Sequence, residues 1–177
     1  MIRIGTCSWK YDSWKGILYP DKEKFNLLEE YSNHFNTVEI DQWFWSLFES
    51  KKPVLPKKND VELYTNSVPD DFKFTIKVQN SITLTHYYNK NKSAPLKPNK
   101  YFFDRDLFES FLEALNPMSK KIGVLMFQFE YLNKQKISGL TEFLERFESF
   151  ITVLDKKFTY GVEIRNPNFL KKPFLSL

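Results

Sequence analysis

Apolar and polar residues alternate along several short segments of this chain. Alternation with a period of two is typical of a half-buried β-strand, and a short continuous apolar run is typical of a strand buried on both faces. The run IGVLMFQF is of the second kind. Together the patterns predict five strands, at residues 2–9, 37–41, 71–78, 122–129 and 160–164.

Between these strands, apolar residues recur at the three- and four-residue spacing of amphipathic helices. The spacing predicts helices over 25–35, with Asn26 as N-cap, over 106–115, where Pro117 ends the pattern, and over 141–154. The Pro- and Lys-rich stretch after residue 41 predicts an irregular segment. Ser81–Lys100 is predicted to be the longest loop, at the surface and beside a pocket. Strands that alternate with helices indicate an α/β fold built on a parallel sheet.

The last polar residues on several of the predicted strands are charged or amide side chains. They are Glu39, Lys77, Gln128, Glu163 and Arg165. Because the carboxyl ends of parallel strands meet at one edge of the sheet, we expect these side chains to converge there on a ligand site. Burying an unpaired charge costs several kcal/mol, so the acidic and basic members should be charge partners.

Composition favours a folded intracellular protein. The 177 residues are 42% hydrophobic, which suits one globular domain. Cys7 is the single cysteine, which fits a reducing compartment, and we expect a small buried thiol there. Polar residues interrupt the amino terminus, and no apolar run approaches the roughly 18 residues of a membrane span. We therefore expect a cytoplasmic protein that does not enter a membrane.

The net charge of +4 comes mainly from lysines in predicted loops, such as Lys90 and Lys92 within YYNKNK. Basic loops with interleaved aromatic residues can follow a phosphate backbone and stack on bases. A nucleic-acid-binding module that uses these loops and the tryptophans is therefore an alternative function. A solvated lysine surface explains the same residues without any ligand.

Several motifs, taken in order, resemble the YecE-like family, known as domain of unknown function 72. They are GTCSWKYDSWKG, YSNHFNTVEIDQWFW, VPDDFKFTIKV, TH at 85–86, GVLMFQF and VEIRNPNF. The resemblance implies a TIM-barrel type (β/α) fold and a cytosolic protein whose family has no established activity. It places the family's polar motif residues at Trp9, Trp14, Glu39, Lys77, His86, Gln128, Glu163 and Arg165. Two positions depart from the family pattern, Asp41 for asparagine and Glu130 for proline.

Length is a further departure, because an eight-fold barrel typically needs about 250 residues. With 177 residues, the chain offers about five of eight β/α units, so we expect residues 1–177 to form one incomplete barrel domain. An interrupted or split gene is our hypothesis for the shortfall. The fifth strand would then present an unpaired edge, through which the protein could associate with itself.

Acid–base chemistry at the strand ends is the leading functional hypothesis. Glu39 and Glu163, with His86, are candidate catalytic groups of a hydrolase or isomerase. Lys77 and Arg165 are candidate anchors for an anion, and Gln128, Trp9 and Trp14 are candidate ligand contacts. The ligand would be a small polar or anionic molecule, sugar-like or phosphate-like. A disrupted gene product without activity is a third reading.

Metal and cofactor signals are weak. Glu39, Asp41, His86 and Glu163 are ligand types that suit Mg or Mn, which leaves such a site as an alternative. The chain has no HExxH or CxxC spacing and no glycine-rich nucleotide motif. The sequence therefore assigns no metal ligands and leaves the cofactor unknown.

Overall fold

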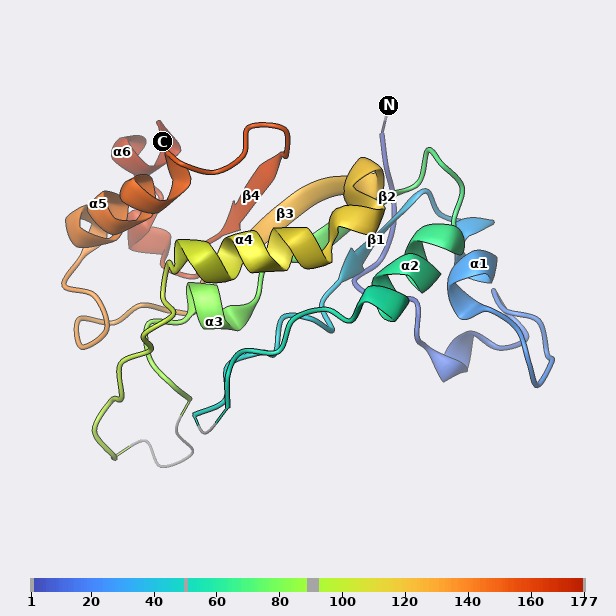
Figure 1. Cartoon of the computed structure of the whole chain (residues 1–177), viewed down its shortest axis with the longest axis horizontal. Helices are drawn as coiled ribbons and strands as arrows, with labels where there is room; N and C mark the ends of the chain where they lie inside the picture. Colours follow the sequence, from blue (N-terminus) through green and yellow to red (C-terminus); the bar gives the residue numbers. More distant parts are fainter. Residues whose placement is uncertain (1, 50, 89–92, 177) are drawn as a thin grey trace.

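A four-stranded parallel sheet forms the centre of the computed structural model, which describes residues 2–49, 51–88 and 93–176 (Figure 1). Its strands, in spatial order, are β1 (Thr37–Ile40), β2 (Lys73–Lys77), β3 (Ile122–Gln128) and β4 (Tyr160–Glu163). Every neighbouring pair is parallel. The α/β class and four of the five predicted strands are confirmed.

The two faces of the sheet differ in burial. One face is apolar and fully buried, with Val38, Ile40, Phe74, Ile76, Leu125 and Phe127. The other carries Glu39, Thr75, Lys77, Val124 and Met126, which are half-buried. Side chains of a strand alternate between faces, so the register puts the charged residues of neighbouring strands on one side. The alternation predicted this sidedness correctly.

The prediction of a strand over residues 2–9 is wrong. The segment runs beside β1, and Glu39 N donates to Thr6 O at 3.0 Å. The next contact is made by a side chain instead of the backbone: Thr6 N donates to the Tyr31 hydroxyl at 2.9 Å, and that hydroxyl donates to Thr37 O at 2.9 Å. Because the hydroxyl stands where a direct ladder bond would form, the segment is extended but is not a strand.

Gly5 allows this close approach of the N-terminal segment to β1. A Cβ atom at residue 5 would lie 1.9 Å from Thr37 O, which is far inside van der Waals contact. We expect Gly5→Ala to push the segment off β1 and to cost about 1–3 kcal/mol, as overpacking does. Gly139→Ala is the matched control, because a Cβ there meets nothing within 4 Å. Urea unfolding of both variants checks this, and equal stabilities would contradict the close approach.

The three predicted helices are present. The first is α1 (Leu27–Ser32), where the Asn26 side chain accepts from Leu28 N at 3.1 Å and from Glu29 N at 3.4 Å. The second is α4 (Arg105–Ala114), capped by Asp104, and the third is α5 (Leu140–Ile151). In Figure 1, α4 crosses in front of β3. The predicted N-cap at Asn26 is confirmed, with ends shorter than the pattern suggested.

Other helical segments were not predicted. They are α2 (Lys58–Asn66), α3 (Asn80–Thr83), α6 (Lys172–Leu175) and the 3₁₀ turns η1 (Asp12–Trp14), η2 (Asn116–Lys121) and η3 (Pro167–Phe169). The apolar pattern of α2 is weak, since Val61 and Tyr64 are buried while Leu63 is 57% exposed. Pro117 does follow the end of α4, but it also lies in the first turn of η2, where the backbone N–H that proline lacks is not needed.

An aromatic core fills the space between the buried face of the sheet and helices α4 and α5. The Phe127 ring on β3 lies 5.5 Å from Phe108 on α4, 5.7 Å from Phe150 on α5 and 6.0 Å from Tyr160 on β4. Rings at these separations pack edge-on or offset, which adds to the burial of their apolar surface. This core fixes the position of the strands whose carboxyl ends carry the candidate site.

Strand β4 stands at the edge of the sheet, as the sequence predicted for the last strand. Val162 on it is 39% exposed. Within the part of the chain that the structure describes, no helix has both the length and the apolar character to cross a bilayer.

Candidate functional site

Glu39 and Lys77 meet across the ends of β1 and β2. Glu39 Oε1 lies 3.0 Å from Lys77 Nζ, and the two side chains are 24% and 18% exposed. The expected pairing of these charges is confirmed. Since the pair is half-buried, each partner reduces the cost of removing the other from water. Glu39 Oε1 is therefore the carboxylate oxygen that faces the ammonium.

A second polar group lies at the ends of β3 and β4. Gln128 pairs directly with Glu163 in the sheet register, and its Nε2 donates to Glu163 Oε1 at 2.8 Å. Arg165 Nε approaches the same oxygen at 3.5 Å, so this charge pair is also confirmed. Gln128 is buried, while Glu163 and Arg165 are 44% and 60% exposed. The carboxylate is therefore oriented by an amide and a guanidinium.

His86 lies beyond β2, near the loop that follows β3. Its Nδ1 is 2.9 Å from Thr85 Oγ1. Burial is the main cause that lowers the pKa of the imidazole, and the Lys136 ammonium lowers the pKa further, while the Glu130 carboxylate opposes both. A lowered pKa favours neutral imidazole at pH 7, the form that can accept a proton.

The pKa of His86 makes a pH-dependent prediction. Unfolding restores the ordinary pKa of His86. The contribution of the neutral imidazole to the free energy of unfolding is therefore fully present above about pH 6.5, and it is lost as the pH falls toward the folded pKa. Lys136→Met should raise the pKa of His86, because it removes a positive charge, whereas Glu130→Gln should lower it. Titration of the imidazole protons by NMR measures both shifts. Shifts in the same direction would contradict this electrostatic account.

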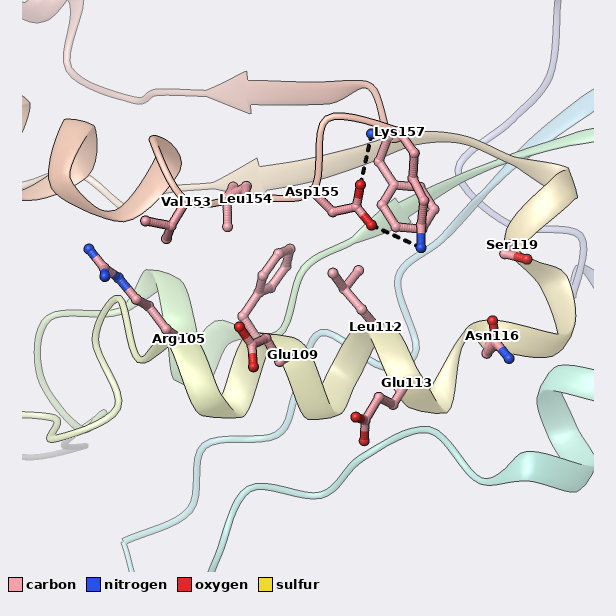
Figure 2. Close-up of a pocket in the computed structure, with 12 residues that line it drawn as sticks. Arg105, Glu109, Leu112, Glu113, Asn116, Ser119, Val153, Leu154, Asp155 and Lys157 are labelled. Carbon is pink, nitrogen blue, oxygen red and sulfur yellow. Dashed lines mark hydrogen bonds and ion pairs between the residues drawn. The ribbon is translucent and has the colours of Figure 1, made fainter.

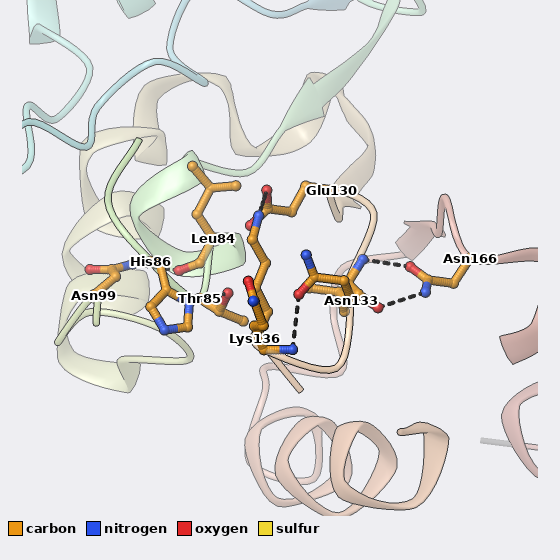
Figure 3. A network of polar contacts seen from close by, with 10 residues as sticks. Leu84, Thr85, His86, Asn99, Glu130, Asn133, Lys136 and Asn166 are labelled. Atoms are coloured by element: carbon orange, nitrogen blue, oxygen red, sulfur yellow. Dashed lines mark hydrogen bonds and ion pairs between the residues drawn. The ribbon is translucent and has the colours of Figure 1, made fainter. Parts of the chain in front are cut away.

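Glu130 and Lys136 form an ion pair within one loop (Figure 3). Their side chains are 28% and 18% exposed. The other carboxylate oxygen, Glu130 Oε1, is buried and has no hydrogen-bond partner among the described residues. Glu130 is one of the two departures from the family pattern, and Lys136 compensates its added negative charge.

Buried asparagines hold the loops that follow three of the strands. After β1, Ser46 N and Leu47 N both donate to Asn80 Oδ1 at 2.9 Å. After β2, Asn99 Nδ2 donates to Ser81 O at 2.7 Å. An asparagine side chain offers both donors and an acceptor, so one residue can satisfy several buried backbone groups. The loops at this end of the sheet are thus fixed in place.

The third of these residues is Asn166, which follows β4. It binds the backbone of Leu132 twice: Leu132 N donates to Oδ1 at 2.8 Å, and Nδ2 donates to Leu132 O at 2.9 Å. This contact, visible in Figure 3, ties the loop of Glu130 and Lys136 to the segment that carries Arg165. None of the three asparagines was predicted. Their position just after a strand, or opposite such a loop, is the signal that could have found them.

The two predicted tryptophan contacts pack against other rings. Trp9 is 4% exposed and meets Tyr64 edge-on, with ring centroids 5.0 Å apart. Trp14 is half-buried and lies parallel to Tyr31 at 6.4 Å. This burial favours a packing role, and ligand contact by either residue stays a prediction.

Cys7 and the metal alternative differ from what the sequence suggested. Cys7 is exposed, with its sulfur 3.3 Å from the Tyr11 hydroxyl, so the expectation of a buried thiol is wrong. Among the described residues, the structure brings no three histidine, cysteine or acidic side chains together as a metal site. Asp41, Glu163 and His86 therefore do not join Glu39 as a ligand set.

Surface hollows lie away from the strand ends. One, of about 540 Å³, lies between α4 and the turn that precedes β4, with Leu112 and Leu154 in its lining (Figure 2). Another, of about 430 Å³, is lined by residues around His34. None of the predicted site residues lines either hollow. The basic loop proposed for nucleic acid includes Lys90 and Lys92, which lie outside the described residues, so that use stays a prediction.

Comparison with known proteins gives concordant results. The family model described as "Protein of unknown function DUF72" matches residues 3–177. UPF0759 protein YecE of Escherichia coli K12 is 28% identical over 173 residues, which are 97% of this chain and 51% of YecE. UPF0759 protein YunF of Bacillus subtilis is 28% identical over 133 residues, 73% of this chain and 40% of YunF. This chain thus spans about half the length of these relatives.

A solved structure agrees with the fold. The crystal structure of a DUF72 family protein from Enterococcus faecalis matches with a TM-score of 0.62 at 22% identity, over 99% of this chain and 55% of that chain. This likeness supports the α/β architecture. Because the family model covers nearly the whole sequence, the chain belongs to the DUF72 family.

Proposed function

We propose that this protein binds or turns over a small polar or anionic ligand, sugar-like or phosphate-like, at the carboxyl ends of its strands. The observation that carries the proposal is that an oriented carboxylate lies near the carboxyl end of each outer strand of a parallel sheet. Glu39 is held by Lys77, and Glu163 is held by Gln128 and Arg165. Polar groups at this edge of an α/β sheet form the usual ligand site of such folds.

The carboxylates are suited to hydroxyl-bearing ligands. Glu39 Oε1 faces Lys77, and Glu163 Oε1 faces Gln128 and Arg165, so a ligand hydroxyl would donate to the second oxygen, Oε2, of either carboxylate. A neutral His86 at the same end would supply a proton acceptor, so acid–base hydrolysis or isomerisation is the reaction class that we propose. The fixed loops favour this, because a site that is already ordered loses less entropy on binding.

We infer in addition that residues 1–177 form one partial domain of a TIM-barrel-like (β/α) fold. A parallel sheet whose charged face is half-buried and whose last strand is an edge fits a part of a closed barrel. The coverage of about half of YecE is consistent with this. Self-association through the β4 edge is the corresponding proposal for partners, and a cytoplasmic location is the proposal for where the protein acts.

A thermal-shift screen tests the proposed function. Sugars, sugar phosphates, nucleotides and divalent metals would each be added to the purified chain, since a ligand that binds only the folded state raises its stability. We expect at least one sugar or phosphate compound to raise the Tm, and the response to disappear in Glu163→Gln. Glu148→Gln, on the exposed side of α5, is the matched control that should keep the response.

Two outcomes would count against the proposal. A screen with no response from wild-type protein would remove the support for a ligand site. A response that survives Glu39→Gln and Glu163→Gln unchanged would place the ligand elsewhere on the molecule. If the protein bound nucleic acid with an affinity that fell steeply with salt concentration, as phosphate contacts do, the result would instead favour the alternative function of a nucleic-acid-binding module.

A further inference from the structure

Lys10 differs from the other cations at the strand ends. Lys77, Lys136 and Arg165 each contact a carboxylate, so their charge is compensated. Lys10 follows the extended N-terminal segment, at the same end of the sheet as the residues after β1. Within the part of the chain that the structure describes, no carboxylate lies at ion-pair distance from its Nζ atom. Its positive charge is therefore uncompensated by the protein.

The Lys10 ammonium is nevertheless held in place by neutral groups. Nζ donates to Gln42 Oε1 at 2.8 Å and to the Tyr64 hydroxyl at 3.1 Å. Gln42 Nε2 in turn donates to the same hydroxyl at 2.7 Å. Because an ammonium has three donors, one N–H remains for a ligand.

Aromatic rings add to this positioning. Nζ lies 5.1 Å from the centroid of Trp9 and 5.6 Å from that of Tyr64. Both rings are fixed, since Trp9 is 4% and Tyr64 is 8% exposed, and the electron-rich faces attract the cation without neutralising it. The Lys10 side chain is therefore largely ordered before a ligand binds, and binding costs less side-chain entropy.

We propose that Lys10 is an anion-binding residue of this protein, and that Gln42 and Tyr64 are its positioning residues. The inference rests on the proposed ligand site at the strand ends and names a residue of it. The ligand group is a compact oxyanion such as phosphate, for which an ammonium acts as a point charge. Lys77 and Arg165 would then serve mainly to orient Glu39 and Glu163, in place of the anchoring role predicted for them.

The test measures the affinity of the protein for inorganic phosphate at low ionic strength by ³¹P NMR titration. Lys10→Met should weaken binding by about tenfold, the scale of one charge-assisted hydrogen bond after discount for exposure. Lys58→Met, which also removes one charge, should change it less than twofold, because Lys58 is an exposed partner of Glu62 on α2. Tyr64→Phe should weaken binding at unchanged net charge, and Lys10→Arg should restore part of it.

The outcomes separate this inference from the proposed function. Equal weakening by Lys10→Met and Lys58→Met would overturn it, since only total charge would matter. Phosphate binding that persists in Lys10→Met but is lost in Lys77→Met would overturn it and leave the strand-end ligand site intact. If phosphate did not bind but neutral sugars raised the Tm, the inference on Lys10 would be overturned and the strand-end ligand site would remain. Absence of both responses would contradict the inference and the proposed function together.

Discussion

Phe127→Ala should destabilise the protein by about 3–5 kcal/mol, the range for removing a buried phenylalanine ring. Phe127 is fully buried near the carboxyl end of β3, and its ring packs against rings on α4, α5 and β4. Contacts to three other elements are therefore lost at once, and the cavity cannot close without moving one of them. Urea unfolding followed by tryptophan fluorescence measures the loss.

Two further variants make this result specific. Phe127→Leu keeps most of the volume and should cost clearly less than the alanine variant. Phe48→Ala, at a site that is 48% exposed, should cost about 1 kcal/mol or less. If Phe127→Ala and Phe48→Ala were equally stable, β3 would not be the centre of the core.

Asn166→Ala is expected to cost about 2–4 kcal/mol, because it leaves a buried N–H and a buried C=O of Leu132 without partners. Asn166 is 1% exposed, so water is not at hand to replace the amide. Asn166→Asp keeps the acceptor for Leu132 N but loses the donor to Leu132 O. The aspartate would also bury a carboxylate against Leu132 O, so chemical unfolding should show both variants to be less stable than wild type.

Asn133→Ala is the control for that position. Its side chain accepts from Gln135 N at 3.0 Å in an exposed turn of the same loop, so its loss should cost about 1 kcal/mol or less. Amide hydrogen exchange adds a local readout. Asn166→Ala should speed exchange at Leu132 while β2 stays protected. Unchanged exchange at Leu132 would contradict the role of Asn166 as a clamp.

Alternation predicted the sheet because side-chain faces follow directly from the strand period. The same reasoning predicted that Glu39, Lys77, Glu163 and Arg165 are charge partners, because buried charges need partners, and the structure pairs Glu39 with Lys77 and Glu163 with Arg165. It failed at residues 2–9, where alternation is present but the Tyr31 hydroxyl stands in the ladder. A distant side chain that replaces a backbone bond leaves no trace in local pattern.

Residues whose roles depend on tertiary contacts could not be predicted from the sequence either. Nothing near Asn166 in the chain indicates that its partner is Leu132, 34 residues earlier. Lys10 lies within the motif that carried the family resemblance, yet its contacts come from Gln42 and from Tyr64 on α2, a helix that the weak apolar pattern concealed. Such contacts join distant segments, so only the fold reveals them.

The proposed function requires a ligand site at the carboxyl ends of the strands. The most direct measurement is an ¹H–¹⁵N correlation spectrum of the protein titrated with the strongest compound of the thermal-shift screen. We expect shift changes concentrated at residues 39–42, 77–79, 128–133 and 163–166, with saturation at a single affinity. Changes centred instead on the hollow beside α4, around Leu112 and Leu154, would contradict the account.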